Sequence, residues 1–473
     1  MKRPVRFIHA LLPILVLSAL IVAGLIVGPL FLDVPAAPLE VIFILASAFA
    51  VAELVWLGIP WTDIQASVVK KMSSALPAFF ILFTIGIIIS TWMVSGTIPM
   101  LVYYGLEVVS PRYLYVWCFM VPIVFATLTG TSWGAAGTVG VVLIGIASVL
   151  QAPLGIAAGA IIGGAYFGDK MSPLSDTTNM AALATDVDLY DHIRSMMVTT
   201  VPSAMLTTAA FLVIGFTHPP AILEGDASTI QPFLDSLAEM FTFNIWLLLP
   251  ALIALVGSVR RMPIIPVLIT SVLVAALEAL IFQRFTLSDV LISMNTGFDA
   301  SMATWVTAPL PETVALVSRG GLYSMSSAIF VAWLIFFFIG AIDIIDAMPT
   351  VVNRVFRFAK TRSVTILAAL GASAFTNAMT ANQYATSFIV GDAFKSRFDL
   401  LRIPRKVLSR SIEDYGTMIE SIVPWHATTV FMIATLGVPW ADYWHWQLLT
   451  LINLIIAPLF ALSGRGCFYD ETD

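Results

Sequence analysis

Long apolar runs recur along this chain, and they constrain its fold more than any other feature. A helix needs about 20 apolar residues to cross the roughly 30 Å hydrocarbon layer of a bilayer. The runs lie at residues 8–31, 38–59, 77–95, 113–128, 134–150, 153–167, 195–216, 245–258, 263–282, 322–342, 363–375, 384–394, a split stretch around 419–437, and 447–462. They lack the alternating pattern of a membrane barrel. With 59% hydrophobic residues and a mean hydropathy of +0.95, the chain has too little polar surface for a soluble protein. We therefore predict an all-α polytopic membrane protein with about 11–14 membrane segments.

The two halves of the chain repeat the same order of features. Each half has a pair of apolar runs, an amphipathic stretch, one further run, and then a polar patch within apolar sequence. The matched stretches are 61–72 with 285–294, "FATLTGTSWGAAGTVG" with "ASAFTNAMTANQYATSF", and "FGDKMSPLSDTT" with "IEDYGTMIESIV". We predict repeats over 1–190 and 244–462, joined by a connecting span and polar loop over 191–243 and followed by a tail over 463–473.

Basic residues indicate how these halves are oriented. Lys2, Arg3 and Arg6 predict a cytoplasmic N-terminus. The second-half loop 346–362 carries four basic residues, whereas its first-half counterpart, 96–112, has only Arg112. The halves are therefore expected in opposite orientations, which is typical of secondary transporters with inverted repeats, broken helices and re-entrant hairpins. We expect a multi-pass protein of the bacterial cytoplasmic (inner) membrane.

The stretch "GAYFGDKMSPLSDTTNMAA" places Asp169, Lys170 and Asp176 directly after an apolar run. Each such charge costs about 2.5–3.5 kcal/mol at the middle of a membrane. One interpretation is a loop end in water, with a helix that starts at Pro173 and is capped by Ser172. The small residues before the charges favour a second interpretation, in which a broken helix packs against the rest of the protein and the charges are buried. We prefer this second interpretation.

Oxygen-bearing side chains surround the predicted breaks in both halves. The first half has Thr129, Thr131, Ser132 and Thr138; the second half has Thr376, Asn377, Thr380, Asn382 and Gln383, then Glu413, Asp414, Thr417, Glu420 and Ser421. Unwound backbone at membrane depth is tolerated only where it is buried or lines a cavity. Hydroxyl, carbonyl and carboxylate oxygens suit alkali and alkaline-earth cations. The apparent symmetry predicts that Asp414 faces Asp169.

Two blocks resemble the NhaC-type Na+/H+ antiporter family, within a larger superfamily of ion transporters. The first is "GTSWGAAGTVGVVLIGIA" with the stretch from Gly164 to Ala182, and the second is "LSRSIEDYGTMIESIVPW". The resemblance implies cation-coupled exchange. It assigns roles to Asp169, Ser172, Asp176 and Thr177 from the first block and to Glu413, Asp414 and Thr417 from the second. His426 and "ANQYAT" depart from the family pattern, which leaves the substrate less certain than the fold.

A single buried site can couple two ions. Burial disfavours the charged form of a carboxyl group, and a bound cation favours it, so the site holds either protons or the metal ion. We predict exchange of Na+ for H+ at Asp169, Asp414, Asp176 and Glu413, with Asp169, Asp176 and Asp414 as Na+ ligands. Supporting ligands are Ser172, Ser175, Thr177, Thr131, Asn377, Thr380, Gln383 and Thr417. Expected partners are Na+, protons and the lipid bilayer, with no nucleic acid and no cofactor; a homodimer is compatible with the sequence.

Two other classes of transport protein stay open. A Na+- or H+-coupled carrier of a small organic acid or amino acid would hold its anion at half-helix N-termini. An ion channel would line a continuous pore with the polar patches. An enzyme is not expected, because no nucleophile–base pair is visible in the sequence.

Overall fold

The regular structure of this chain is helical. The computed structural model describes residues 4–222 and 227–469, and every regular element in these ranges is a helix. The first helices are α1 (Phe7–Ile21), α2 (Gly28–Phe31), α3 (Leu39–Trp56), α4 (Trp61–Val94), α5 (Thr97–Val108), α6 (Leu114–Thr129), α7 (Ser132–Ala135), α8 (Val141–Val149), α9 (Leu154–Met171) and α10 (Asp176–Ala184). The middle of the chain forms α11 (Leu189–Thr217) and α12 (Ala227–Met240). The remaining helices are α13 (Leu249–Val259), α14 (Ile264–Phe282), α15 (Leu287–Thr296), α16 (Pro311–Val317), α17 (Ser326–Asp343), α18 (Ala347–Val355), α19 (Arg362–Thr380), α20 (Gln383–Leu400), α21 (Arg405–Tyr415), α22 (Ala427–Leu436), α23 (Trp440–Tyr443) and α24 (Leu448–Ser463).

The helices confirm the predicted class of polytopic membrane protein. Within the described ranges, nine helices are long and apolar enough to cross a membrane. Two further pairs pass the same test together but are bent by 98° and 47° at a short break, which brings the number of spans to as many as 11. That number is the lower end of the predicted range.

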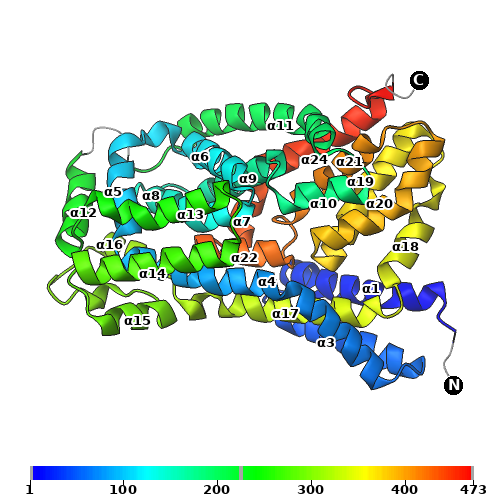
Figure 1. Ribbon diagram of the computed structural model, residues 1–473, viewed down its shortest axis with the longest axis horizontal. Coiled ribbons are helices and arrows are strands. Elements are labelled where there is room, and N and C mark those ends of the chain that lie inside the picture. The colour runs from blue at the N-terminus through cyan, green and yellow to red at the C-terminus, as the bar shows by residue number, and fades with distance from the viewer. Residues whose placement is uncertain (1–3, 223–226, 470–473) are drawn as a thin grey trace.

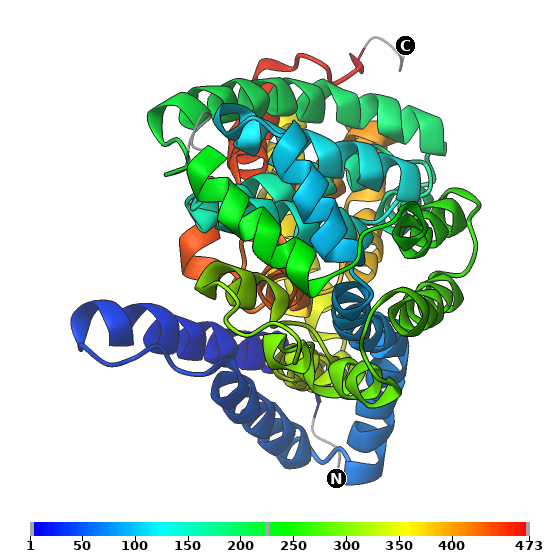
Figure 2. The same ribbon diagram turned by 90° about the vertical axis from the view of Figure 1, so that its left-hand side faces the viewer.

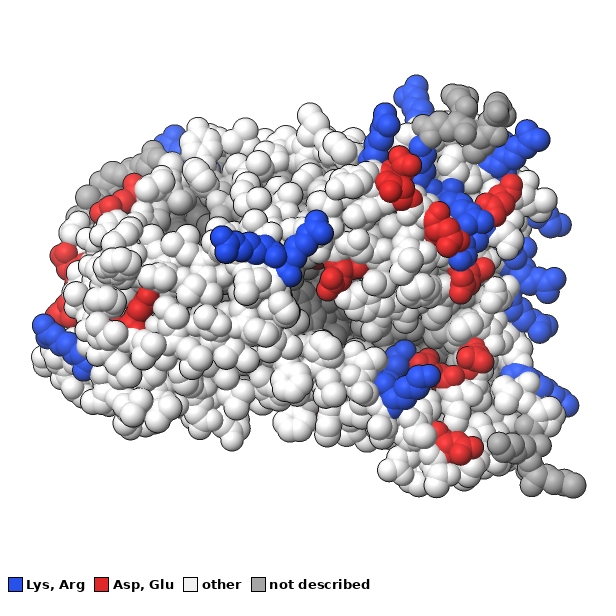
Figure 3. All heavy atoms as spheres, in the orientation of Figure 1, with Lys and Arg blue, Asp and Glu red and all other residues white. Residues whose placement is uncertain are grey.

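The long helices run broadly along the longest axis of the molecule (Figure 1). Both ends of the chain lie at the same end of this axis, α9 and α10 lie nearer its middle, and α21 lies between them and that end. Figure 2 shows that the hairpin of α1 and α3 projects from one side of the body. Lys and Arg side chains gather at the end that holds both termini, whereas much of the remaining face carries no charge (Figure 3). An uncharged band beside a basic end is what a membrane-embedded protein presents.

Two helix pairs are each broken at a single residue with a left-handed backbone. Gly130, at φ +70°, separates α6 from α7, and Ala381, at φ +45°, separates α19 from α20. The next residue caps the second helix in both cases: Thr131 accepts from the backbone N–H of Gly134, and Asn382 accepts from that of Ala385. The two polar patches that were matched between the halves of this sequence therefore contain the two helix breaks.

A second matched pair of breaks follows the first along the chain. The helix α9 ends before the non-helical residues 172–175, and α21 ends before a single 3₁₀ turn, η8 (Thr417–Ile419). The break between α4 and α5 likewise matches that between α17 and α18, with Pro99 and Pro349 each at the third helical position. These matches support the predicted repeats, whose boundaries remain a prediction.

One expectation from the apolar runs is wrong. The amphipathic stretch 61–72 and the run 77–95 do not form separate elements, because α4 continues as one helix of 34 residues through Pro77. The second half differs from the first here, since α15, α16 and α17 are separate helices. The amphipathic stretch 61–72 is therefore not followed by a break in the helix. A helix can continue from the membrane–water interface into the hydrocarbon layer.

The helices α6 and α9 pack closely because α9 presents glycines to α6. A Cβ atom added at Gly164 would lie 2.1 Å from the carbonyl oxygen of Phe119. At Gly168 it would lie 2.4 Å from the carbonyl oxygen of Ile123. Close backbone approach through small residues is a main source of helix association in membranes. This contact positions the end of α9, where Asp169 and Lys170 lie.

We predict that Gly164→Ala lowers the thermal unfolding temperature in detergent, because the new methyl group must displace the backbone of α6 at a cost of about 1–3 kcal/mol. The matched control is Gly371→Ala on α19, where the nearest atom to an added Cβ lies 3.6 Å away. The control should unfold at or above the wild-type temperature, since alanine favours a helix by about 1 kcal/mol over glycine. Equal unfolding temperatures for the two variants would contradict the packing argument.

Candidate functional site

The break after α9 lies directly against the break between α6 and α7. The hydroxyl of Ser172 donates to the carbonyl oxygen of Thr127 at 2.8 Å. A Cβ atom at Gly130 would meet the backbone of Leu174 at 2.6 Å. The helix α10 begins at Asp176 with Ser175 as its cap, so the expected start at Pro173 with Ser172 as cap is wrong. The Ser172 hydroxyl instead ties the two breaks together.

Asp169 lies at this junction and is buried, with 6% of its surface exposed. Its Oδ2 accepts a hydrogen bond from the backbone N–H of Ser132 at 3.1 Å. Ser132 is the first residue of the helical stretch 132–149, so the carboxyl group meets the positive end of a helix dipole. No ion pair joins Asp169 to a basic side chain in the part of the chain that the structure describes.

Asp414 lies nearby on α21, and a basic residue neutralises it. Lys170, the residue after Asp169, donates to its Oδ1, and both side chains are buried. Thr199 donates to Oδ1 at 3.0 Å and to Oδ2 at 2.9 Å, and Asn453 donates to Oδ1 at 3.2 Å. The Nε of Arg410 lies 3.9 Å from Oδ2. The partner of Asp414 is thus Lys170, and that Asp414 faces Asp169 stays a prediction.

Glu413 is fully buried and has no basic partner in hydrogen-bonding distance among the described residues. Thr417 donates to its Oε2 at 2.7 Å. Gln383, at the break between α19 and α20, donates a long hydrogen bond of 3.5 Å to its Oε1. Glu413 is thus the carboxyl group of α21 that has no dedicated cation.

Glu420 is the fourth buried carboxyl group of the site, and neutral donors from both halves hold it. Tyr166 and Thr428 each donate to Oε2 at 3.1 Å, and Asn377 donates to Oε1 at 3.3 Å. His426 contacts Oδ1 of Asn377 through Nε2 at 3.1 Å. His426, which departs from the family pattern, is therefore connected to the buried Glu420 through Asn377.

The charges of this cluster do not balance. Within the described residues, the cluster has four buried acids, Asp169, Glu413, Asp414 and Glu420, against the ammonium group of Lys170 and the guanidinium group of Arg410. The buried imidazole of His426 adds a positive charge only when it is protonated. Ionising all six groups would leave two negative charges uncompensated. An isolated buried carboxylate is very costly, so such groups take up a proton or a cation. The cluster can therefore hold ions that the polypeptide itself does not supply.

The other predicted residues fall into two groups. Asn377, Gln383 and Thr417 contact the buried acids, and Ser175 and Thr380 are buried at the two breaks. Asp176 is exposed, receives a long hydrogen bond of 3.4 Å from Tyr384, and lies next to the half-buried Thr177; Thr131 is half-buried as the cap of α7. Among the described residues, no three or more His, Cys, Asp or Glu side chains form a group arranged for a metal ion, so Asp169, Asp176 and Asp414 do not converge in that way. Their role as Na+ ligands stays a prediction.

Several contributors were missed from the sequence. Thr199, Asn453 and Tyr166 donate hydrogen bonds to the carboxyl groups, and Arg410 lies 3.9 Å from Asp414. None of these four was predicted as a site residue. Asn453 offered a signal, because it is the one amide in the apolar run 447–462 after Gln447. An isolated polar residue within a membrane span usually serves a function.

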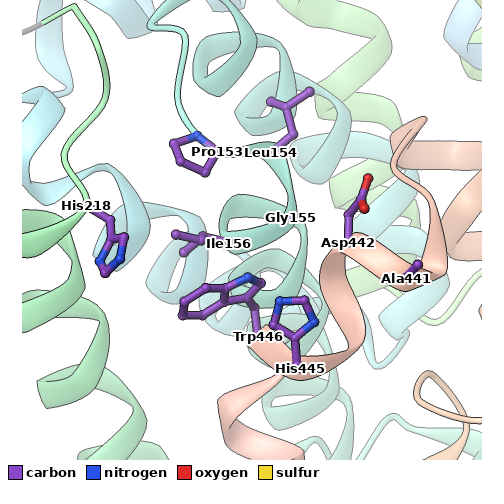
Figure 4. Close-up of a pocket in the computed structure, with 9 residues that line it drawn as sticks. All are labelled: Pro153, Leu154, Gly155, Ile156, His218, Ala441, Asp442, His445 and Trp446. Atoms are coloured by element: carbon purple, nitrogen blue, oxygen red, sulfur yellow. The ribbon is translucent and has the colours of Figure 1, made fainter.

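A surface pocket of about 410 Å³ lies elsewhere, at the start of α9 (Figure 4). Figure 4 shows His218 and His445 on either side of Trp446 in this pocket. Leu154, the first residue of α9, lies roughly 22 Å along the helix from Asp169. None of the buried acids lines the pocket, so we do not place the functional site there.

Outside the membrane spans, an exposed charge cluster joins the ends of α20 and α21. Arg405 donates to both carboxylate oxygens of Asp399, at 2.9 and 2.7 Å, and to Asp186 at 2.8 Å. The Arg405 guanidinium holds the pKa of Asp399 below its ordinary value, because these hydrogen bonds favour the ionised form. The cluster fixes the turn that leads into α21 and hence into Glu413.

Comparison with known proteins gives consistent results. The profile described as the Na+/H+ antiporter family matches residues 164–465. An Na(+)/H(+) antiporter of Haemophilus influenzae is 37% identical over 97% of this chain and 96% of its own length. The Na(+)/H(+) antiporter NhaC of Alkalihalophilus pseudofirmus is 34% identical over 91% of each chain. The malate-2H(+)/Na(+)-lactate antiporter of Bacillus subtilis is 28% identical over 98% of this chain and 97% of its own length.

We predict that Lys170→Met lowers the free energy of unfolding by about 3–5 kcal/mol, because it leaves Asp414 buried without its cation. The double variant Lys170→Met/Asp414→Asn should recover much of this loss. As a control, Lys71→Met removes the half-exposed partner of Asp343 and should cost at most about 1 kcal/mol. Reversible unfolding in mixed micelles measures all three. A Lys170→Met cost as small as that of the control would show that the buried pair is not needed for the fold.

Proposed function

The chain belongs to the Na+/H+ antiporter family, and we propose that it exchanges Na+ for protons at the buried carboxyl groups beside its helix breaks. The matched relatives confirm the resemblance to NhaC antiporters. Its helices make it a multi-pass membrane protein. The observation that carries the proposal is the excess of buried acids over buried bases in one cluster. Such a cluster must bind external cations or protons to persist in a low-polarity interior.

Competition between the two ions follows from the chemistry of this cluster. A proton and Na+ each neutralise the same carboxylate, so the binding of one releases the other. The neutral donors around Glu420 and Glu413 are hydroxyl and amide groups, whose oxygens are also hard ligands for an alkali cation. Exchange results when the site opens alternately to each side and cannot cross while it is empty and charged.

We assign the exchange to Asp169 and Glu413 and give Asp414 a positioning role. Three donors already occupy Oδ1 of Asp414, and one of them is the ammonium group of Lys170. A sodium ion at Asp414 would have to displace that bond. Among the residues that the structure describes, Asp169 and Glu413 accept hydrogen bonds from neutral donors only, so their charge is open to an incoming cation. Of the four carboxyl groups predicted from the sequence to exchange ions, Asp169 and Glu413 thus keep that role in our proposal, and Asp414 does not.

The site lies between the two proposed inverted repeats, residues 1–190 and 244–462. Tyr166 from the first repeat and Thr428 from the second both hold Glu420, so movement of one repeat against the other changes its surroundings. The basic end of the molecule, where both termini lie (Figure 3), would face the cytoplasm of a cell whose inner membrane holds the protein.

A carrier of small organic acids is the second candidate function. The Bacillus subtilis relative is named for malate and lactate exchange coupled to 2H(+) and Na(+). If this chain carries organic acids, Na+ should move across vesicle membranes only when lactate or malate is added. A simple Na+/H+ antiporter needs no organic substrate. Comparing the two conditions with the wild-type protein separates the candidates.

We predict that adding Na+ to the purified protein releases protons, and that Asp169→Asn and Glu413→Gln reduce this release to background. Removing either carboxyl group removes a place where the two ions compete. The matched control is Glu107→Gln, an exposed acid on α5, which should release protons as the wild type does. A pH-sensitive dye in weakly buffered detergent solution records the release, and vesicle exchange confirms it.

The double variant Lys170→Met/Asp414→Asn then tests the role of Asp414. If Asp414 only positions Lys170, this variant still releases protons on Na+ addition, with a changed Na+ affinity. Suppose instead that the folded double variant releases no protons on Na+ addition, whereas Glu413→Gln releases them as the wild type does. The exchange would then have to be assigned to Asp414 and not to Glu413.

The two uncompensated charges also predict electrogenic exchange. Two protons neutralise the cluster, whereas one Na+ leaves one negative charge, so exchange of one Na+ for two protons moves net charge. We expect a potential that is negative inside the vesicle to accelerate proton entry coupled to Na+ exit. A potassium gradient with valinomycin sets the potential, and an internal pH dye reports the rate. Rates that do not depend on the potential would exclude this stoichiometry.

A further inference from the structure

The segment that follows α24 turns back onto the helices of the site. After α24, residues 464–469, here called the C-terminal strap, pack against α11 and α21. Gly466 adopts φ +64°, and a Cβ atom there would lie 2.3 Å from Cγ1 of Val198. Cys467 is completely buried. The strap is therefore a packed part of the structure.

Basic side chains of the charged end clamp the aromatic residues of the strap. The ammonium group of Lys406 lies 4.1 Å from the centre of the Phe468 ring. The guanidinium of Arg362 lies 4.6 Å from the centre of the Tyr469 ring. Such cation–π contacts contribute about 0.5–1 kcal/mol each at exposed sites. They add to the packing of Gly466 and Cys467 in holding the strap.

Arg410 connects the strap to the buried carboxyl groups. It is 2% exposed, and its Nη1 donates to the carbonyl oxygen of Gly466 at 2.8 Å and to that of Ser195 at 3.4 Å. Its Nε lies 3.9 Å from Oδ2 of Asp414, too far for a hydrogen bond. The short bond to the strap thus draws Arg410 toward a neutral acceptor and away from the carboxylate.

We propose that the C-terminal strap positions Arg410 so that Lys170 stays paired with Asp414 and Glu413 stays open to the transported cation. If the strap leaves, Arg410 loses its short acceptor, and Asp414 is the nearest carboxylate. A charge-assisted bond is roughly twice as strong as one to a neutral carbonyl, so Arg410 moves onto Asp414. Lys170 is then free to pair with Glu413, the residue that precedes Asp414 on α21. A paired Glu413 binds Na+ less well.

This inference rests on the proposed exchange at Glu413, and removal of the strap tests it. Truncation after Ser463 should raise the Na+ concentration for half-maximal proton release by about tenfold, with little change in the maximal release. Truncation after Tyr469 is the matched control and should leave that concentration unchanged. In the Arg410→Gln background, truncation after Ser463 should have no further effect, because no guanidinium remains to displace Lys170.

A stability measurement tests the strap without any transport assay. In the full-length chain Lys170→Met leaves Asp414 with the guanidinium of Arg410 held at 3.9 Å, whereas in the chain truncated after Ser463 Arg410 can move closer and take the place of Lys170. Lys170→Met should therefore cost clearly less unfolding free energy in the truncated chain. An equal cost in the two chains, or an unchanged Na+ concentration in folded truncated protein, would overturn the inference. If wild-type protein releases no protons but the stability difference is found, the proposed function fails and the positioning role of the strap stands.

Discussion

The burial of Lys170 and Asp414 against each other is the interaction on which the arrangement of the central helices depends. The pair joins α9 to α21, and Thr199 and Asn453 add α11 and α24 to the same contact. Two charges can stay inside a membrane protein only if they are paired and their remaining donors and acceptors are used. Four helices are therefore held in one relative position at the depth where two of them break.

The broken helices are tolerated because each break satisfies its own backbone. Thr131 and Asn382 cap the helices that restart after Gly130 and Ala381, and Ser175 caps α10. Helix ends leave free N–H groups, and at membrane depth no water replaces the missing partners. The hydroxyl and amide residues thus serve structure first. Their second consequence is a cluster of oxygen atoms beside acids that the polypeptide does not fully neutralise.

The division of labour between neighbouring residues follows from this geometry. Asp169 and Lys170 are adjacent on α9, and Glu413 and Asp414 are adjacent on α21, yet only one residue of each pair enters the ion pair. The remaining acids, Asp169 and Glu413, keep their charge available. A cation in transit and a permanent structural cation can then coexist in one cluster, provided that the structural one is held in place. Arg410 and the C-terminal strap lie where they can control that condition.

Much of the architecture followed from the sequence, because membrane solvation acts on the chain locally. Apolar length predicted the spans, and the positions of Gly, Thr, Asn and acidic residues predicted the breaks near residues 130, 172, 381 and 416. The charged residues of the site were also visible, since few charges occur in such runs. Which acid pairs with which base could not be read from the sequence, because it depends on how α9, α11, α21 and α24 pack, and adjacent residues point in different directions. Tertiary structure alone paired Asp414 with Lys170, left Asp169 and Glu413 unpaired, placed Asp176 at the surface, and brought Gly466 onto Arg410 across 56 residues of chain.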